Sequence, residues 1–577
     1  MDAHEAPADA SRGAAPARRD ALRRLIPGGP RARLALAAIL LAGLAAGVMI
    51  ENWSANQSSH YDLIRALDDG RTRIDSGPYP TIDRALFKGH YYSARAPGLA
   101  LYSLPFYELL EGVGAPGLAR SSPALHGEDE MVDFVGWWGN VLPGLILMGL
   151  IWRVAERLEP GCGAFTAVAV GLGTLLLPFS TMLFSHVFSA MLGFAAFAVA
   201  MRERAGPPRP LLLAAAGLLA GYGVSSEYPL AFVAIVVGLY LLSRPGSRGG
   251  RALAARLGCY GLGALAGIVP LALYNRAAFG SFTHVAYSNI PQQQKGFFGI
   301  TAPNPKVLAT LLLDSRGLLT ISPVLILGGV GTWLLFRGGR RAEALAITGV
   351  CLCYALYNSG YYLPFGGTSP GPRFLITVLP FLGCPIGLSL KRYPGPTVAL
   401  AGASVMTLAI ITATHPLVIY ETNTLVWAKL LGQGEFQATI ATAFGLGRGW
   451  SGIWPFVLAV GGAVLLAGAA TPRLRLGPRE LVGGAGSLLA WGLFAALAPT
   501  LLGIDHRALE SIFKAGDPKA FAVRLHGGSS YPLTSLVLYA AGAGAMALAA
   551  MWALRREPPE RPGSPPSRAR PSAAAPG

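Results

Sequence analysis

Charged side chains are scarce in this chain. Asp, Glu, Lys and Arg supply 13% of its 577 residues, about half of the share that is usual in soluble globular proteins. Hydrophobic residues supply 52%, and the mean hydropathy is +0.46. This balance excludes an ordinary soluble domain and predicts a membrane protein.

Cysteine is also rare, with five residues in the whole chain. These cysteines lie in or beside apolar stretches and show no paired spacing in the more polar segments: Cys162, Cys259, Cys351, Cys353 and Cys384. The pattern indicates neither a disulfide framework nor a metal site. We therefore expect no metal and no cofactor.

The basic residues exceed the acidic ones, which gives a net charge of +17. They are scattered over short connectors and lack interleaved aromatic residues, so the pattern argues against nucleic-acid binding. Basic residues beside apolar stretches are typical of proteins held against anionic lipid headgroups.

The dominant feature is a series of about 13–14 apolar stretches, each near the roughly 20 residues that a helix needs to cross a bilayer. We place them at 33–50, 132–153, 162–182, 185–202, 209–225, 226–243, 253–276, 318–337, 342–362, 373–390, 396–418, 453–470, 481–503 and 531–554. The predicted fold class is an all-α, polytopic transmembrane helix bundle.

Basic residues distinguish the two faces of this bundle, because they gather in the tails and in every second connector. The connectors on this face hold Arg153 and Arg157; Arg202, Arg204 and Arg209; Arg244, Arg248, Arg251 and Arg256; Arg337, Arg340 and Arg341; Lys391 and Arg392; Arg473, Arg475 and Arg479. The positive-inside rule then predicts that both termini are cytoplasmic and that the long segments 51–131, 277–317, 363–372, 419–452 and 504–530 lie outside.

The tails, 1–32 and 557–577, are rich in Ala, Pro and Arg or Ser and predict disorder. In the first outer segment, 51–131, apolar Tyr61, Leu63, Ile64 and Leu67 recur at helical spacing. They predict a short amphipathic helix at the membrane interface. A loop is expected over 81–98, and a second interfacial or re-entrant helix over 99–112.

One motif stands at the end of this loop. Asp83 is followed by Gly89, His90, Tyr91, Tyr92 and Ser93, then by Arg95, Pro97 and Gly98. In order downstream come Ser185 and His186; Glu227, Tyr228 and Pro229; Tyr274, Asn275, Phe279 and Gly280; Arg316, Gly317 and Leu318; and Gly366, Gly367, Ser369, Gly371, Pro372 and Arg373. By the predicted topology, all of these residues face the outside.

The series resembles the membrane-integral glycosyltransferases of the GT-C superfamily, such as protein mannosyltransferases and lipopolysaccharide galacturonosyltransferases. The resemblance covers about residues 33–390, which would form the catalytic module, with 391–556 as further transmembrane helices. The chain departs from the pattern in two respects. Asn56 and Gln57 stand where better-known relatives have an acidic pair, and Arg95 replaces a Lys that is common there.

The resemblance implies a hexosyl- or pentosyltransferase of cell-envelope glycan biosynthesis in the plasma (inner) membrane. Such enzymes move a sugar from a polyprenyl-phosphate carrier to a hydroxyl of a glycan, lipid or protein acceptor, outside the cytoplasm. The lipid-linked donor is a substrate, and the carrier stays in the bilayer.

This chemistry needs a carboxylate to take the acceptor proton and cations to stabilise the leaving phosphate. Asp83 is the first candidate for the base and Asp62 the second, although Asp83 could instead pair with Arg84 or Lys88 as a solvated loop charge. The phosphate candidates are Arg373, Arg95 and Lys88, with Arg316 weaker. The substrate-binding candidates are His90, Tyr92, His186, Glu227, Tyr228 and Asn275.

These residues also have structural interpretations. An arginine at a helix end can extend to the interface, a membrane-level histidine can be a hydrogen-bonded core residue, and tyrosines are common interfacial anchors. Other functions stay open as well: a transporter or flippase of a lipid-linked glycan, a polymerase or ligase with a similar donor, and a non-catalytic scaffold. Charges are almost absent from the middle of the stretches, which argues against a transporter.

Overall fold

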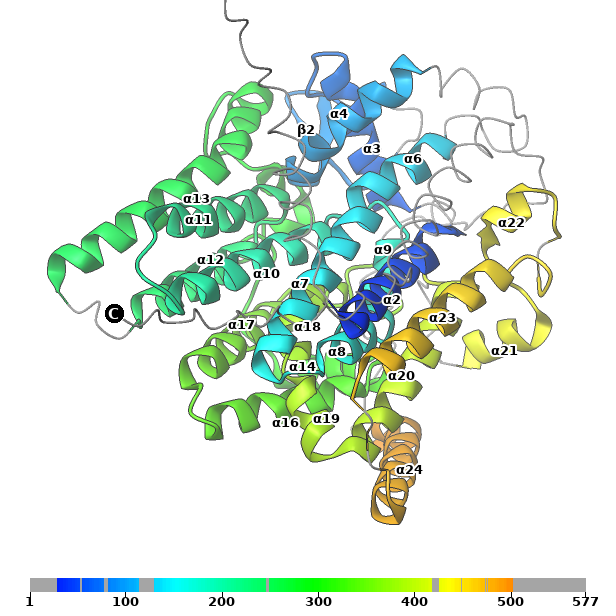
Figure 1. Cartoon of the computed structure of the whole chain (residues 1–577). Helices are drawn as coiled ribbons and strands as arrows, with labels where there is room; N and C mark the ends of the chain where they lie inside the picture. Colours follow the sequence, from blue (N-terminus) through cyan, green and yellow to red (C-terminus); the bar gives the residue numbers. More distant parts are fainter. Residues whose placement is uncertain are drawn as a thin grey trace, which may run out of the picture.

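The computed structural model describes residues 29–51, 54–76, 81–113, 129–244, 249–417, 425–447, 449–472, 474 and 476–501. Nearly all regular structure in these ranges is helical (Figure 1). The predicted all-α class is therefore confirmed. Residues 1–28, the C-terminal tail and the stretch 531–554 lie outside the described residues, whereas residues 30–32, predicted as part of the disordered N-terminal tail, begin the first helix.

Every other predicted stretch coincides with one helix or with consecutive helices. In the N-terminal half these are α2 (Pro30–Gly47), α6 (Asp129–Gly136), the π-helix η1 (Trp137–Val141), α7 (Leu142–Leu158), α8 (Gly163–Leu172), α9 (Leu176–Ser180), α10 (Ser185–Arg204), α11 (Pro210–Ser226), α12 (Leu230–Leu242) and α13 (Gly250–Phe279). In the C-terminal half they are α15 (Leu318–Ile321), α16 (Val324–Arg337), α17 (Arg341–Ser359), the 3₁₀-helix η4 (Arg373–Val378), α18 (Leu379–Gly383), α19 (Ile386–Arg392), α20 (Pro394–Thr414), α23 (Trp454–Ala470) and α24 (Pro478–Leu501).

The remaining elements lie between these stretches. They are β1 (Met49–Ile50), α3 (Ala55–Asp68), β2 (Arg84–Phe87), β3 (His90–Ser93), α4 (Gly98–Gly112), the 3₁₀-helices η2 (Ala286–Asn289) and η3 (Pro291–Gln293), α14 (Pro305–Leu313), α21 (Leu425–Gln433), β4 (Ala438–Thr439) and α22 (Ile440–Ala443).

By length and composition, six helices in the described part can each cross a membrane. Two helix pairs bent by 92° and 51° raise the number to eight, and α8, α11, α12 and α23 are shorter apolar helices. The chain is thus a multi-pass membrane protein, with fewer full-length spans in the described part than the 13–14 predicted. Gly and Pro residues divide several of the apolar stretches into two shorter helices, and hydropathy alone predicts one continuous span for each such stretch.

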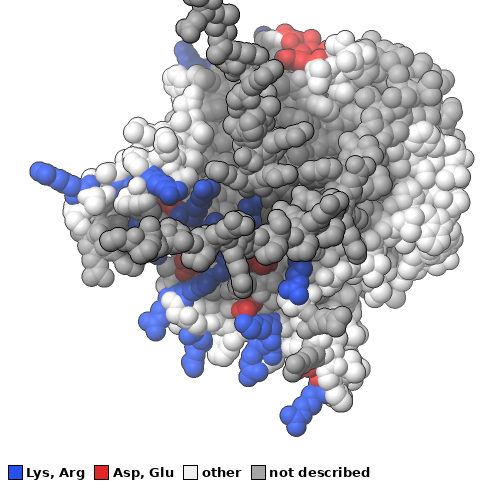
Figure 2. All heavy atoms as spheres, in the orientation of Figure 1, with Lys and Arg blue, Asp and Glu red and all other residues white. Residues whose placement is uncertain are grey.

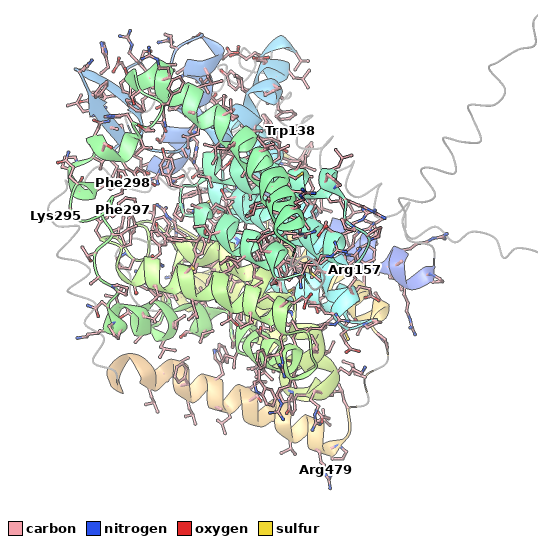
Figure 3. All side chains as sticks on the ribbon, turned by 90° about the vertical axis from the view of Figure 1, so that its left-hand side faces the viewer. Trp138, Arg157, Lys295, Phe297, Phe298 and Arg479 are labelled. Carbon is pink, nitrogen blue, oxygen red and sulfur yellow. The ribbon has the colours of Figure 1, made fainter. Side chains whose placement is uncertain are left out.

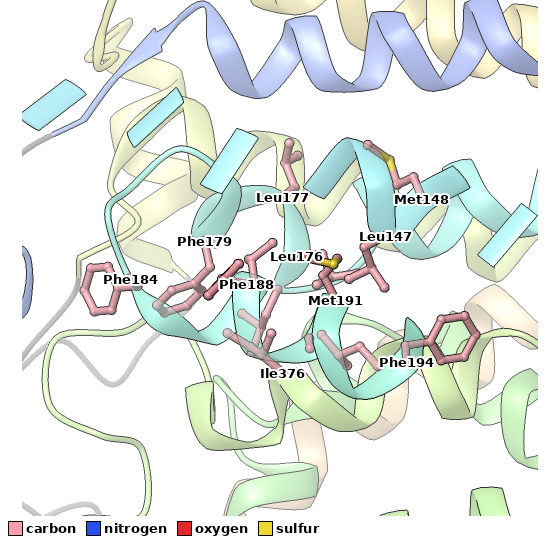
Figure 4. Close-up of a cluster of buried hydrophobic side chains, with 14 of the residues drawn as sticks. Leu147, Met148, Leu176, Leu177, Phe179, Phe184, Phe188, Met191, Phe194 and Ile376 are labelled. Carbon is pink, nitrogen blue, oxygen red and sulfur yellow. The ribbon is translucent and has the colours of Figure 1, made fainter. Parts of the chain in front are cut away.

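The core is built around α10, which is buried over most of its length. Figure 4 shows its Phe188, Met191 and Phe194 among Phe179, Leu147 and other side chains from α7 and α9. Phe194 also meets Phe381 of α18 edge to face, with 5.2 Å between ring centroids. This packing sets the N-terminus of α10, which carries His186, deep inside the bundle.

Glycines let α11 and α13 approach backbone to backbone. A Cβ at Gly217 would lie 2.0 Å from the carbonyl oxygen of Tyr260, and one at Gly263 would lie 2.1 Å from that of Ala214. Ser225 adds a hydrogen bond to the carbonyl of Gly267, 2.8 Å long. Small residues spaced four apart are a usual device for close helix pairs in membranes.

The first outer segment differs from its prediction in two ways. Residues 81–98, predicted as a loop, contain a β-hairpin in which Arg84 pairs with Ser93 and Phe87 with His90. Its two-residue turn has Lys88 and Gly89 at positive φ, which suits the twist of a tight hairpin.

The helix predicted from 61–67 is present as α3, but its first two turns are buried on all sides. Both faces of α3 are therefore covered by other parts of the chain there, and its location at the membrane interface stays a prediction. The hairpin gives Ser59 of α3 its hydrogen-bond partners, and the N-cap Ser54 accepts from the backbone amide of Gln57. The predicted helix over 99–112 is α4. Tyr102 and Phe106 of α4 stack on Trp138 of η1, labelled in Figure 3.

The C-terminal helices pack directly on the first one. α23 lies against α2 (Figure 1), and β1 pairs antiparallel with β4. The end of the first helix is thereby joined to the segment 425–447.

Basic residues of the connectors gather at the lower left of Figure 2, whereas β2, α3 and α4 lie together at the top of the same view in Figure 1. In Figure 3, Arg157 and Arg479 lie on the opposite side from Lys295 and Phe297. Not all of these arginines face solvent or lipid, however. Arg244 and Arg256 both pair with Glu203, which is fully buried, so they tie α10 to α13 and to the end of α12.

Candidate active site

Asp83 and Arg95 form an ion pair at the base of the hairpin. Asp83 precedes β2 and Arg95 follows β3, and the amide of Ala94 donates to the carbonyl of Asp83 at 3.1 Å. The Arg95 guanidinium binds Oδ2 of Asp83, and no donor from the described residues reaches Oδ1. Burial lowers the pKa of Arg95, but the Asp83 carboxylate outweighs this and raises it overall.

The solvated pairing considered for Asp83 is not observed. Arg84 lies over the ring of Tyr91, 3.7 Å from its centroid, and Lys88 is exposed at the tip of the hairpin.

Helix α3 braces this pair. Ser59 donates to the carbonyl of Asp83 at 2.6 Å and shares a 2.8 Å hydrogen bond with Ser93. The Asn56 amide, oriented with its oxygen toward Arg95, accepts hydrogen bonds from Nε and Nη2 at 3.1 and 3.2 Å. Asn56, at the place of the expected acidic pair, thus holds the guanidinium instead.

Arg373 begins η4 and is 4% exposed. Its guanidinium lies over the rings of Phe184 and Phe374, 5.3 and 5.5 Å from their centroids. Its one protein hydrogen bond within the described ranges is a long one, 3.5 Å, to the carbonyl of Thr368. No described carboxylate lies within salt-bridge distance of it. Arg373 is therefore a buried cation without a paired anion.

The glycines before Arg373 make room for its side chain. Gly366 and Gly367 both have positive φ, 83° and 89°, and a Cβ on Gly366 would lie 2.3 Å from Nε of Arg373. The small residues of this turn therefore leave space for the arginine side chain itself.

His186 and Glu227 form a second, buried contact. Ser185 also donates to the Glu227 carboxylate, at 2.8 Å. The His186 ring lies edge to face with Phe374 at 5.8 Å, so His186 and Arg373 share an aromatic neighbour. This contact joins the start of α10 to the link between α11 and α12.

These groups form one electrostatic cluster. The charge of Arg373 interacts with Arg95, Asp83 and Glu227, and that of His186 interacts with Glu227, Arg373 and Arg95. The structure thus brings together the carboxylate at 83 and the guanidinium at 373, which are far apart in sequence.

Tyrosines border the cluster. Tyr228 meets Tyr287 edge to face at 4.9 Å, and Gln293 donates to the hydroxyl of Tyr361 at 2.9 Å. Burial raises the pKa of Tyr287 to about 12, partly offset by Arg95. Its hydroxyl is therefore protonated at neutral pH.

Other predicted residues lie elsewhere. His90 contacts Asp75 and Arg73 on the exposed side of the hairpin. Tyr92 packs on Phe279, 5.0 Å between centroids, and Asn275 donates to the carbonyl of Phe282 at 3.3 Å.

Asp62 is 3% exposed on α3. It lies six residues after Asn56, which places it about 240° around the helix axis and away from the face that holds Arg95.

Among solved structures, the chain is similar to ArnT. ArnT from Cupriavidus metallidurans bound to undecaprenyl phosphate is 14% identical, with a TM-score of 0.46, and the match covers 90% of this chain and 75% of that one. The apo state of the same protein is 17% identical, with a TM-score of 0.44, and the match covers 82% of this chain and 77% of that one. The chain is also similar to the Archaeoglobus fulgidus oligosaccharyltransferase AglB in complex with an inhibitory peptide and a dolichol-phosphate. That structure is 11% identical, with a TM-score of 0.39, and the match covers 74% of this chain and 56% of that one.

No family model matches the chain, and no curated protein does. The function proposed below therefore rests on this chain's own residues.

Two buried groups were missed by sequence analysis. His60 is fully buried on α3, four residues after Asn56. This spacing could have indicated that His60 belongs with Asn56, because it puts both residues on one face of the helix. Glu51 is 3% exposed and accepts a 3.1 Å hydrogen bond from Thr181. Burial raises the pKa of Glu51 well above its usual value.

No group of three or more His, Cys, Asp or Glu in the described part could hold a metal ion. Metal independence stays a prediction.

Proposed function

We propose that this chain transfers a sugar from a polyprenyl-phosphate carrier to an acceptor hydroxyl at the extracytoplasmic face of the membrane. The observation that carries the proposal is Arg373, a buried guanidinium that has no paired carboxylate among the described residues and that interacts electrostatically with a second guanidinium, Arg95. A buried cation of this kind is costly unless an anion accompanies it. A phosphate suits two guanidiniums, because each can donate to two of its oxygens.

Asp83 is the base in this scheme. Its Oδ2 is held by Arg95 and its Oδ1 has no donor from the described residues, so Oδ1 can accept the proton of the acceptor hydroxyl. The acceptor oxygen forms a bond to the anomeric carbon as the bond from that carbon to the phosphate oxygen breaks. The negative charge that develops on the leaving phosphate is stabilised by Arg373 and Arg95.

The outer location follows from the positive-inside argument. The cluster lies with α3 and the hairpin, in a segment that the charge pattern assigns to the outside. Both termini are cytoplasmic in this scheme, and the acceptor can be a glycan, a lipid or a protein.

The test replaces Asp83 by Asn and compares lipid-linked sugars and envelope glycans in cells that carry the variant, the wild type or no copy. We expect D83N to lower transfer by about 10²–10⁴-fold, the usual effect of removing a general base, and an undischarged lipid-linked sugar to accumulate. Asp75→Asn is the matched control, because it removes an exposed carboxylate of the same outer segment. Thermal melting of each purified variant shows whether it is folded.

Asp62→Asn tests the second candidate. Unchanged transfer in both D83N and D62N would end the enzyme proposal. A flippase would be indicated instead if cells without the chain kept their sugar-transfer activity but left a lipid-linked glycan on the cytoplasmic leaflet.

A further inference from the structure

His60 is a polar residue that the proposed chemistry has not yet used. Its side chain is fully buried, and neither ring nitrogen has a hydrogen-bond partner among the described residues. It lies one helical turn after Asn56, whose amide binds Arg95. Asn56 and His60, on one face of α3, thus both interact with Arg95.

The surroundings of His60 are cationic. Its ring interacts electrostatically with Arg95, His186 and Arg373. Burial lowers the pKa of His60 well below its usual value, and these positive neighbours lower it further. At neutral pH the ring is therefore uncharged, with one N–H donor and one acceptor nitrogen.

Leaving both nitrogens of a buried ring without partners is unfavourable for folding, so a role in packing alone explains this position poorly. A metal cation would be repelled by Arg95 and Arg373. An oxyanion fits, because it accepts an N–H hydrogen bond and is attracted by both guanidiniums.

We propose that His60 is a third donor to the phosphate of the lipid carrier, giving its ring N–H to a phosphate oxygen beside Arg95 and Arg373. This inference rests on the proposed function and adds a residue to its phosphate site. A neutral donor contributes a hydrogen bond without adding a third positive charge to the cluster.

The test compares His60→Gln, which keeps an N–H donor, with His60→Leu, which keeps similar bulk without one. The probe is undecaprenyl phosphate in detergent micelles, and its affinity for the full chain is measured at pH 7.5. We expect H60L to weaken binding about tenfold, as for a lost hydrogen bond to a charged group, and H60Q to stay within about threefold of wild type. Ser103→Ala is the control, because it removes a different fully buried polar group, a hydroxyl on α4 that also has no partner in the described part.

A pH series gives a second readout. Because the His60 ring is a neutral donor whose pKa lies well below its usual value, the ratio of the wild-type affinity to the H60Q affinity should change little between pH 8 and pH 6. The charged groups that interact with the ring, Arg95, Arg373 and His186, are common to both proteins, as are Asp83 and Glu227, which pair with Arg95 and His186. Their contributions cancel in the comparison.

Three outcomes would overturn the inference. In the first, a folded H60L protein binds the probe as well as the wild type does. In the second, H60Q and H60L lose binding equally, and in the third, H60Q binds normally but has lost transfer activity. The last would mean that His60 accepts a proton instead. Arg373→Leu separates this inference from the proposed function. If R373L loses binding and H60L does not, the phosphate site is supported and the role of His60 is contradicted. If the wild-type protein does not bind the probe, the proposed function itself is contradicted.

Discussion

At the scale of single residues, the site depends on how cations are held in a buried place. Arg95 has Asp83 and Asn56 as partners, whereas Arg373 has two aromatic rings and one long hydrogen bond. The two guanidiniums carry the same charge, but a carboxylate in the described part pairs only with Arg95. This difference supports the proposal that Arg373 binds an anionic ligand.

Gly366→Ala tests whether the position of Arg373 matters. The new Cβ would lie 2.3 Å from Nε of Arg373, so the guanidinium must shift. We expect transfer activity to fall at least tenfold, since small misplacements of a charge-stabilising group are costly.

Gly367→Ala is the matched control for G366A. Gly367 has almost the same positive φ, but its Cβ would meet only Leu363, at 3.9 Å. Both variants should lose about 1 kcal/mol of stability from backbone strain, measured by thermal melting. Equal activity in the two variants would contradict the positioning role.

At the scale of elements, the helices are held by close backbone approach and by buried ion pairs. The π-turn at η1 carries Trp138, on which α4 stacks, and Glu203 joins α10 to two arginines. The helices α11 and α13 approach backbone to backbone at glycines on both of them.

Gly263→Ala should therefore destabilise the bundle. Its Cβ would lie 2.1 Å from a backbone oxygen of α11, and the two helices must separate to admit it, at a cost of about 1–3 kcal/mol. Gly261→Ala, on the same helix, meets nothing within 4 Å and should be neutral or slightly stabilising. Thermal melting in detergent measures both. A G263A protein as stable as G261A would show that the close approach is dispensable.

At the scale of the whole molecule, the distribution of charge separates two faces. Lys295 and Arg479 are both exposed and lie far apart on opposite sides of Figure 3. If the basic face is cytoplasmic, these two positions lie on opposite sides of the membrane.

Single cysteines at these two positions test the orientation. In intact cells a membrane-impermeant thiol reagent should label Lys295→Cys strongly and Arg479→Cys only after permeabilisation. The wild-type chain, with its five native cysteines, gives the background. The reverse pattern would place the proposed site in the cytoplasm.

The helical class, the positions of the apolar stretches and the separation of basic connectors could be predicted from the sequence, because these depend on local composition and helical length. The sequence also indicated that Asp83, Arg95, His186, Glu227 and Arg373 are related. The folded structure was needed to show that they form one cluster, that Lys88, His90 and Asn275 lie apart from it, and that α3 is buried. These outcomes depend on which surfaces meet, and no single stretch of sequence contains that information. The role of His60 has the same origin, since one turn of helix sets it beside charges from α10 and η4 that are more than a hundred residues away.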